Sequence, residues 1–171
     1  LSCPEEIKLP EGYGILWQGI KWEANGKPCS KGLGIIYKKY HAKVSGWYKS
    51  SLFYAIPLYI KGYEIIAFWP TKNKTEEKSY PQIAQEIINH YIYDKSHDYS
   101  SAILIGDFNC FCGQKEGGRK FGDMKRVNKI LNKQHFKSIY HHVTKEKLGE
   151  ETKATYFHNF KEDKPFFLDY A

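Results

Sequence analysis

Two polar residues at the end of an apolar stretch have the types and the spacing of a catalytic or metal-binding pair. Asp107 and Asn109 follow the apolar run 102–105 and Gly106. On an extended chain, residues two apart project to the same side. A carboxylate can bind a divalent cation or take a proton from water, and an amide can donate a hydrogen bond to a charged oxygen. The alternative is an ordinary Asp/Asn turn after a strand, and these residues alone leave both interpretations open.

The apolar run itself predicts the strand that positions this pair. A continuous run of this length is typical of a strand covered on both faces. Further strands are predicted at 13–21, 32–38, 44–48, 52–60, 63–69, 154–158 and 166–170, and turn chemistry is predicted at 23–31. The strands 52–60 and 63–69 are expected to form a tight antiparallel hairpin joined at Lys61 and Gly62.

Two segments have the period of an amphipathic helix instead. Residues 80–94 place isoleucines on one helical face, with Pro81 in the first turn. Residues 123–134 form a second helix, with Asp123 as a candidate N-cap. The early strands are expected to pair with one another, and a helix then leads to the central strand. A second helix precedes the two late strands. This order predicts an α/β (α+β) fold. We expect one domain, a two-layer sandwich of mostly antiparallel sheets flanked by helices.

The chain of 171 residues has a formal net charge of +7, which favours a polyanionic partner, with nucleic acid ahead of anionic lipid. Basic residues are concentrated just after Asn109, in a glycine-rich loop with Lys115, Arg119 and Lys120 and on the following helix. Lys72 lies in an earlier lysine-rich loop. A phosphate-rich substrate near Asp107 and Asn109 would be attracted by this charge. For the helix lysines, a merely solvated face is an equally good explanation.

The four cysteines do not have the spacing of a zinc site, and we expect free thiols in a reducing compartment. No apolar segment has the length of a membrane span, and no signal peptide is recognisable. These features predict a cytoplasmic protein without a membrane partner, and we expect a monomer.

The chain resembles the endonuclease/exonuclease/phosphatase superfamily, which includes exonuclease III-like and deoxyribonuclease I-like enzymes. Residues 105–109, Ile-Gly-Asp-Phe-Asn, resemble the Gly-Asp-Phe-Asn strand end of that family. Residues 154–158, Ala-Thr-Tyr-Phe-His, and residues 167–170, Phe-Leu-Asp-Tyr, resemble its Thr-(Tyr/Phe) and Asp-Tyr strands. The motifs also occur in the order of the family, and the resemblance covers nearly the whole chain.

The resemblance implies a role for each matching residue. Asp107 would orient or deprotonate the attacking water and contact a metal ion, and Asn109 would contact the metal site and donate a hydrogen bond to a phosphate oxygen. Asp169 would orient a histidine through its ring nitrogen. The implied reaction is hydrolysis of a phosphate ester with Mg²⁺ or Mn²⁺ as cofactor. His158 is a further catalytic candidate, although a lone histidine on a strand is more often structural.

The chain also departs from the pattern of the family. Its metal-binding Glu on an early strand and its terminal Ser-Asp-His have no counterpart in residues 1–171, so the first and last strands are expected to be missing and the chain alone to be inactive. Trp69 stands where many nucleases of the group have a tyrosine. Trp69 could stack on a base or sugar, but a core aromatic at the end of a hairpin is the favoured interpretation.

The sequence thus predicts a magnesium-dependent phosphodiesterase, most plausibly a nuclease that acts on DNA or RNA. One alternative is a member of the same fold that binds nucleic acid without cutting it. The other is a phosphatase of a small-molecule or lipid phosphate ester. Neither DNA against RNA nor endonuclease against exonuclease follows from the sequence.

Overall fold

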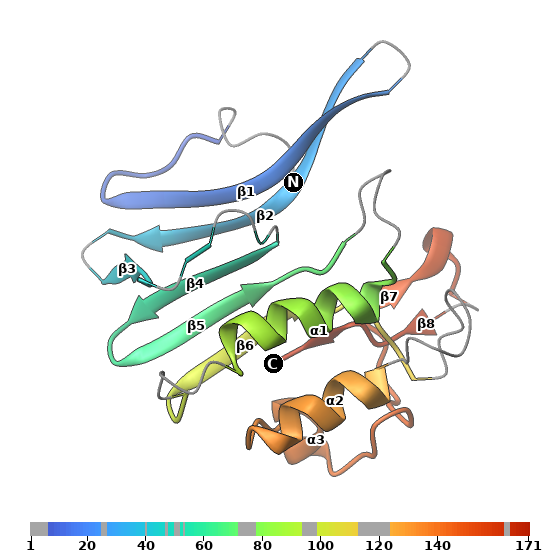
Figure 1. Cartoon of the computed structure of the whole chain (residues 1–171). Helices are drawn as coiled ribbons and strands as arrows, with labels where there is room; N and C mark the ends of the chain where they lie inside the picture. The colour runs from blue at the N-terminus through green and yellow to red at the C-terminus, as the bar shows by residue number, and fades with distance from the viewer. Residues whose placement is uncertain are drawn as a thin grey trace. The chain divides into compact units, whose positions relative to one another are not determined.

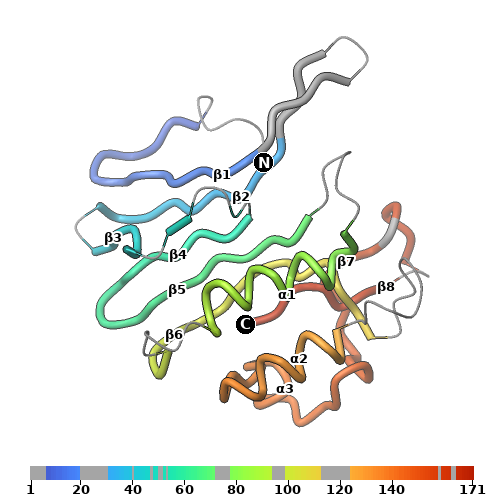
Figure 2. The backbone as a smooth tube through the Cα atoms, in the orientation of Figure 1, coloured from blue at the N-terminus to red at the C-terminus, as the bar shows by residue number. Residues whose placement is uncertain are grey.

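The structure is a computed structural model, and it describes residues 7–24, 27–39, 41–46, 48–49, 52, 54–71, 78–93, 99–112, 124–162 and 165–171. The chain divides into two compact units. Figures 1 and 2 show the chain coloured by residue number. The first unit contains residues 1–69 and 98–104, and the second contains residues 70–97 and 105–171.

The first unit begins with a long antiparallel hairpin of β1 (Tyr13–Ala24) and β2 (Lys27–Lys38). The prediction of a turn over 23–31 was therefore wrong for most of that stretch. Residues 27–31 continue the ladder, with Ser30 opposite Lys21, because hydrogen bonds to β1 satisfy the backbone even where the local sequence favours turns. The predicted strands at 13–21 and 32–38 lie inside these longer strands.

The second sheet of this unit contains β3 (Ala42–Val44), β4 (Ala55–Ile60) and β5 (Tyr63–Phe68), which pair as antiparallel neighbours. The predicted turn between β4 and β5 is confirmed. Lys61 and Gly62 both have positive φ, at 48° and 91°, as the tight hairpin turn that matches the strand twist requires. The strand predicted at 44–48 lies earlier, at β3.

A buried glutamine connects the β1–β2 hairpin to the segment that leads into β4. Gln18 is 5% exposed, its Nε2 donates to the Leu52 carbonyl at 2.9 Å, and its Oε1 accepts from the Ala55 amide at 3.2 Å. Both polar atoms of the amide are thereby satisfied, as burial requires. Apolar side chains of β4 and β5 form the core of this unit: Ile56, Leu58, Ile66 and Phe68.

The second unit contains the helices α1 (Tyr80–Tyr91), α2 (Met124–Lys133) and α3 (Ile139–Thr144). The first helix begins where the sequence indicated, because Gln82 Oε1 accepts a hydrogen bond from the Ser79 amide at 2.7 Å and Pro81 occupies the first turn. α1 packs against α2, as Figure 1 shows, and the buried face of α2 carries Val127 and Leu131. The predicted N-cap Asp123 lies outside the described residues.

The central strand β6 (Ala102–Asp107) has neighbours on both sides in a five-stranded sheet of order β3-β4-β5-β6-β9, and the boundary between the units falls within it. The prediction that both faces of this strand are covered was wrong at Ile105, which is 44% exposed, whereas Leu104 is 6% exposed. Successive side chains of a strand face opposite ways, so an apolar run cannot by itself show which faces are covered.

The two late strands are shorter than predicted. β7 (Tyr156–Phe157) ends in the 3-10 turn η2 (His158–Phe160), where Asn159 has a φ of 55°. The segment 166–170 divides into β8 (Pro165–Phe166), which pairs with β7, and β9 (Asp169–Tyr170), which pairs with β6. The chain changes its pairing partner between these strands.

The predicted fold class is confirmed as a mixed α/β fold, in which a five-stranded sheet occurs with helices and two small sheets. Five of the neighbouring strand pairs are antiparallel: β1–β2, β3–β4, β4–β5, β6–β9 and β7–β8. Among the described helices, none has the length and apolar character needed to cross a membrane. Cys110 and Cys112 are free thiols, as predicted, and the side chains of the other two cysteines lie outside the described part of the chain.

Glu146 organises the loop that follows α3. One of its carboxylate oxygens accepts from the Tyr140 hydroxyl at 2.6 Å and the Thr152 amide at 3.0 Å, and the other accepts from the Thr152 hydroxyl at 2.7 Å. These bonds, the one from the Thr152 hydroxyl foremost, favour the ionised carboxylate and lower the pKa of Glu146 from 4.5 to about 2.

We expect a Glu146→Gln substitution to weaken the protein at pH 6 but to have no effect near pH 2. Because the pKa of Glu146 is lower in the folded chain, its contribution is complete above about pH 4.5 and is lost as the pH falls to about 2. Thermal unfolding of both proteins at pH 6, 4 and 2.5 measures this change. Two melting curves that differ by the same amount at every pH would contradict it.

Candidate functional site

The structure places Asp107 and Asp169 directly opposite each other on the antiparallel strands β6 and β9. The Phe108 amide donates to the Leu168 carbonyl at 2.8 Å, one position beyond this pair. Asp107 and Asp169 are therefore a non-hydrogen-bonded pair, the kind in which facing side chains come closest, with Cα atoms about 4.5 Å apart and side chains on the same face. The sequence placed both residues in one site, but only the register of the strands brings them together.

A pair of facing carboxylates can share a cation. Like charges directly opposite each other destabilise a sheet, whereas a cation between them would stabilise the arrangement. Carboxylate oxygens are the ligands that Mg²⁺ prefers, and one or two of them suffice when water and substrate phosphates complete the shell. Within the described residues, no group of three or more His, Cys, Asp and Glu side chains is placed to hold a metal. The two carboxylates alone would supply only part of the ligand shell of such an ion.

Asn109 is held beside this pair by its own backbone and side chain. Its amide N–H donates to Asp107 Oδ1 at 2.8 Å, and its Nδ2 donates to the Pro70 carbonyl at 2.9 Å. Its φ of 50° is in the left-handed region, which asparagine tolerates better than most residues. The alternative of a simple Asp/Asn turn is therefore correct as local structure, and this turn also fixes both side chains. One of the two Nδ2 hydrogens remains for another acceptor.

Thr155 fixes the position of Asp169. Its Oγ1 accepts from the Leu168 amide at 2.9 Å and from the Asp169 amide at 3.2 Å, at the point where the chain leaves β8 and enters β9. The Thr155 amide in turn donates to the Phe166 carbonyl at 2.9 Å. Thr155 lies within the predicted Thr-(Tyr/Phe) motif, but the sequence predicted no role for its hydroxyl. The signal was present, because a hydroxyl residue before a short strand often bonds to backbone groups.

Aromatic side chains pack on the face of β6 and β9 opposite to Asp107 and Asp169. Phe108 is 2% exposed and its ring lies edge-on to that of Tyr170, with 5.2 Å between the ring centroids. Burial raises the pKa of the Tyr170 hydroxyl above its ordinary value. Because Phe108 alternates with Asp107 and Tyr170 follows Asp169, the apolar side of the two strands is anchored while the carboxylates lie on the other side.

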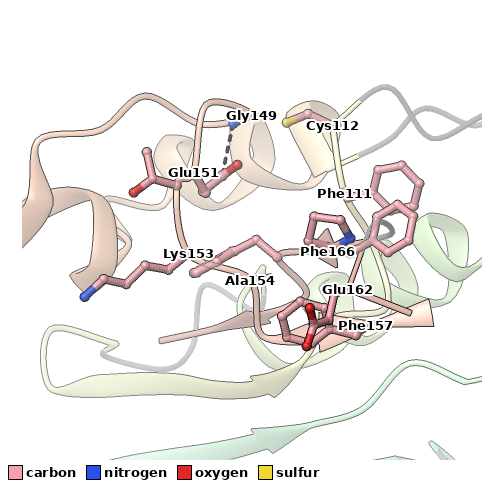
Figure 3. Close-up of a pocket in the computed structure, with 12 residues that line it drawn as sticks. Phe111, Cys112, Gly149, Glu151, Lys153, Ala154, Phe157, Glu162 and Phe166 are labelled. Carbon is pink, nitrogen blue, oxygen red and sulfur yellow. Dashed lines mark hydrogen bonds between the residues drawn. The ribbon is translucent and has the colours of Figure 1, made fainter. Parts of the chain in front are cut away.

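A pocket of about 440 Å³ adjoins the segment that carries Thr155. Figure 3 shows Phe111, Phe157 and Phe166 around it, with Lys153 and Glu162 also in its lining. The rings of Phe111 and Phe166 lie 4.7 Å apart between centroids. Aromatic walls suit a flat ring, such as a nucleobase. The sequence predicted no role for these phenylalanines.

The remaining predicted residues have different outcomes. Trp69 is half-buried in the first unit, where its ring packs edge-on against Tyr54 at 5.2 Å and Lys31 Nζ lies 5.7 Å from the ring centroid. This packing agrees with the favoured interpretation of a hairpin-end aromatic. The side chain of the predicted catalytic residue His158 lies outside the described part of the chain. So do four residues predicted to bind substrate: Lys72, Lys115, Arg119 and Lys120.

Searches of protein-family models, of curated proteins and of solved structures found no match to this chain. The family resemblance therefore stays a prediction, and the function must be argued from the geometry of the site.

Replacing Thr155 by valine is expected to destabilise the protein by about 0.5–1.5 kcal/mol, because two backbone amides lose their protein acceptor. Valine keeps the shape of threonine, so the change isolates the hydroxyl. A Thr155→Ser variant, which retains the hydroxyl, serves as the matched control. Urea unfolding of the three proteins measures the difference, and a valine variant as stable as wild type would show that this hydroxyl does not hold β9.

Proposed function

We propose that this chain belongs to a magnesium-dependent phosphoesterase that hydrolyses phosphodiester bonds, and more specifically to a nuclease. The observation that carries the proposal is the facing pair Asp107 and Asp169, with Asn109 fixed beside it by Asp107 and Pro70. Two carboxylates and an amide at one strand end combine a place for a hard cation with a donor for a phosphate oxygen. The resemblance to the endonuclease/exonuclease/phosphatase superfamily points to the same chemistry.

Each residue has a defined task in this proposal. Asp107 orients the attacking water and accepts its proton, and its carboxylate is held in place by the Asn109 amide. Asn109 Nδ2 donates its remaining hydrogen to a phosphate oxygen as negative charge develops there. Asp169 shares the cation with Asp107 or orients a histidine. Bound Mg²⁺ or Mn²⁺ would supply positive charge to the phosphoryl group.

Nucleic acid is the substrate that the second unit favours. Lys125, Lys129 and Lys133 are exposed along α2 at four-residue intervals, which places them on one face of that helix. Exposed lysines attract a phosphate backbone, and the aromatic pocket beside Thr155 suits a base. A small-molecule or lipid phosphate ester would use the carboxylate pair but not the lysine face. A cytoplasmic location and a monomeric state belong to the same proposal.

The direct test is cleavage of supercoiled plasmid and of single-stranded RNA by the natural protein that carries this chain, in Mg²⁺. We expect Asp107→Ala and Asn109→Ala to reduce cleavage by about 10²-fold or more each. Glu86→Gln is the control, because Glu86 is an exposed residue of α1 that pairs with Lys78. Equal cleavage by all four proteins would refute the assignment. Retained binding without cleavage by any of them would identify a binding module instead.

A further inference from the structure

Outside the carboxylate pair, the side chains of Ser138, His141 and Glu151 are connected in series by hydrogen bonds. His141 Nδ1 lies 2.9 Å from Ser138 Oγ, and His141 Nε2 lies 3.0 Å from Glu151 Oε1. The Glu151 side chain is 9% exposed and that of His141 is 16% exposed. Glu151 Oε1 also accepts from the Gly149 amide at 2.9 Å, a bond that Figure 3 shows. The carboxylate, the imidazole and the hydroxyl are thus held in one line from two separate segments.

One tautomer of the neutral His141 imidazole satisfies both of these contacts. An ionised carboxylate only accepts, so His141 Nε2 carries the proton that it donates to Glu151. In the neutral imidazole, Nδ1 is then an acceptor, and the Ser138 hydroxyl donates to it. A serine that donates to an imidazole, itself oriented by a carboxylate, is the arrangement in which a hydroxyl becomes a nucleophile.

Ser138 is the N-cap residue of α3, so helix capping is an alternative explanation for the position of its hydroxyl. A serine at the N-cap normally accepts a hydrogen bond from a backbone amide of the first turn. Ser138 makes no such side-chain bond, and its hydroxyl is directed to His141 instead. Rings also hold the imidazole in place, since His141 stacks on Tyr170 with 16° between the ring planes. Capping of α3 therefore does not account for the bond between Ser138 and His141.

Ser138 and His141 line a pocket of about 310 Å³, whose other walls supply hydrogen-bond donors. Asn128 and Asn132, four residues apart, project from one face of α2, and Lys137 precedes the serine. Amide and ammonium groups beside a nucleophile can stabilise the negative oxygen of a tetrahedral intermediate. Leu148 adds an apolar wall. The volume suits a small acyl group.

We propose that Ser138, His141 and Glu151 form a second hydrolytic site, which acts on small carboxylic esters. Ser138 Oγ attacks the ester carbonyl and forms a C–O bond while its proton passes to His141 Nδ1. The tetrahedral intermediate then expels the alcohol, which takes that proton from His141. Water attacks the resulting acyl-serine in the same way, releases the carboxylic acid and restores the serine. Glu151 keeps Nε2 protonated throughout and is a positioning residue.

A fluorophosphonate probe tests this proposal on the whole protein, because its phosphorus is attacked by an activated serine and loses fluoride. Mass spectrometry of the digested protein is expected to find one equivalent of adduct on Ser138. Labelling should disappear in Ser138→Ala and in protein unfolded by heat before the reaction. Ser45→Ala, which removes another serine that donates to a carboxylate, should label as wild type does.

Two further variants separate catalysis from structure. His141→Gln can still bond to Ser138 but is not a base, and we expect its labelling rate to fall by about 10³-fold or more. Glu151→Gln keeps an acceptor for the Gly149 amide, and the loss of the correct tautomer should lower the rate by about 10²-fold or more. Melting curves show whether each variant is folded. Unlabelled Ser138 in folded wild-type protein, or equal labelling of a folded His141→Gln variant, would overturn the proposal.

The outcome is independent of the phosphodiesterase site. Asp107→Ala should label at Ser138 at the wild-type rate, and Ser138→Ala should cut nucleic acid as well as wild type does. Hydrolysis of p-nitrophenyl acetate, corrected for the rate of the Ser138→Ala variant, is expected to follow the order of labelling rates. Hydrolysis that is unchanged by Ser138→Ala would show that the ester is cleaved elsewhere and would refute the ester substrate.

Discussion

Replacing Asp107 by asparagine is expected to abolish cleavage of nucleic acid while it makes the folded protein more stable. Asparagine retains an oxygen that can accept from the Asn109 amide, so the local turn is preserved. The substitution removes one of the two facing carboxylates, and the relief of repulsion with Asp169 should add about 0.2–1 kcal/mol to the free energy of unfolding. The loss of the proton acceptor and cation ligand should lower the cleavage rate by about 10³-fold or more.

The opposite signs of these two effects distinguish a functional site from a structural one. Removal of a structural hydrogen bond would lower the stability of the protein, whereas removal of a repulsion that is retained for catalysis raises it. Urea unfolding without divalent ions measures the first effect, and plasmid nicking measures the second. Mg²⁺ should raise the melting temperature of wild type but not of the Asp107→Asn variant. A less stable variant that still cuts would contradict both the charge argument and the site.

The largest expected effect on stability comes from Phe108→Ala, at about 3–5 kcal/mol. Phe108 is 2% exposed, and its removal would leave a cavity against Tyr170. Phe108→Leu is the matched control, because it fills most of the volume but lacks the ring. The lost edge-to-face contact should cost about 0.5–1.5 kcal/mol of that total. Both values follow from urea unfolding curves.

The same substitution should weaken the site through its support. Without the ring that anchors β6 on its apolar side, the carboxylate pair and Asn109 lose their fixed spacing, and a displacement of this kind is costly in catalysis. Cleavage by Phe108→Ala is therefore expected to fall even at temperatures where the protein is fully folded. Wild-type cleavage in a folded Phe108→Ala variant would show that the strand end is positioned by other contacts.

Local patterns in the sequence determined several elements directly. Pro81 marked the beginning of α1, and Lys61 with Gly62 specified the turn between β4 and β5. These signals depend on residues close together in the chain, and such interactions are encoded locally. The spacing of Asp107 and Asn109 likewise predicted a polar strand end. The sequence also predicted that Asp169 belongs to the same site, although through a family resemblance rather than through geometry.

Only the tertiary structure decided which groups meet. The pairing of β6 with β9 placed Asp169 opposite Asp107, and a shift by one residue would have sent the carboxylate to the other face. The Thr155 hydroxyl accepts hydrogen bonds from two amides that are more than ten residues away in the chain. Ser138 and Glu151 are connected only through His141. Composition and periodicity report local preferences. Strand register and side-chain hydrogen bonds between distant segments depend on the packing of the whole unit, and that packing decides the chemistry of the site.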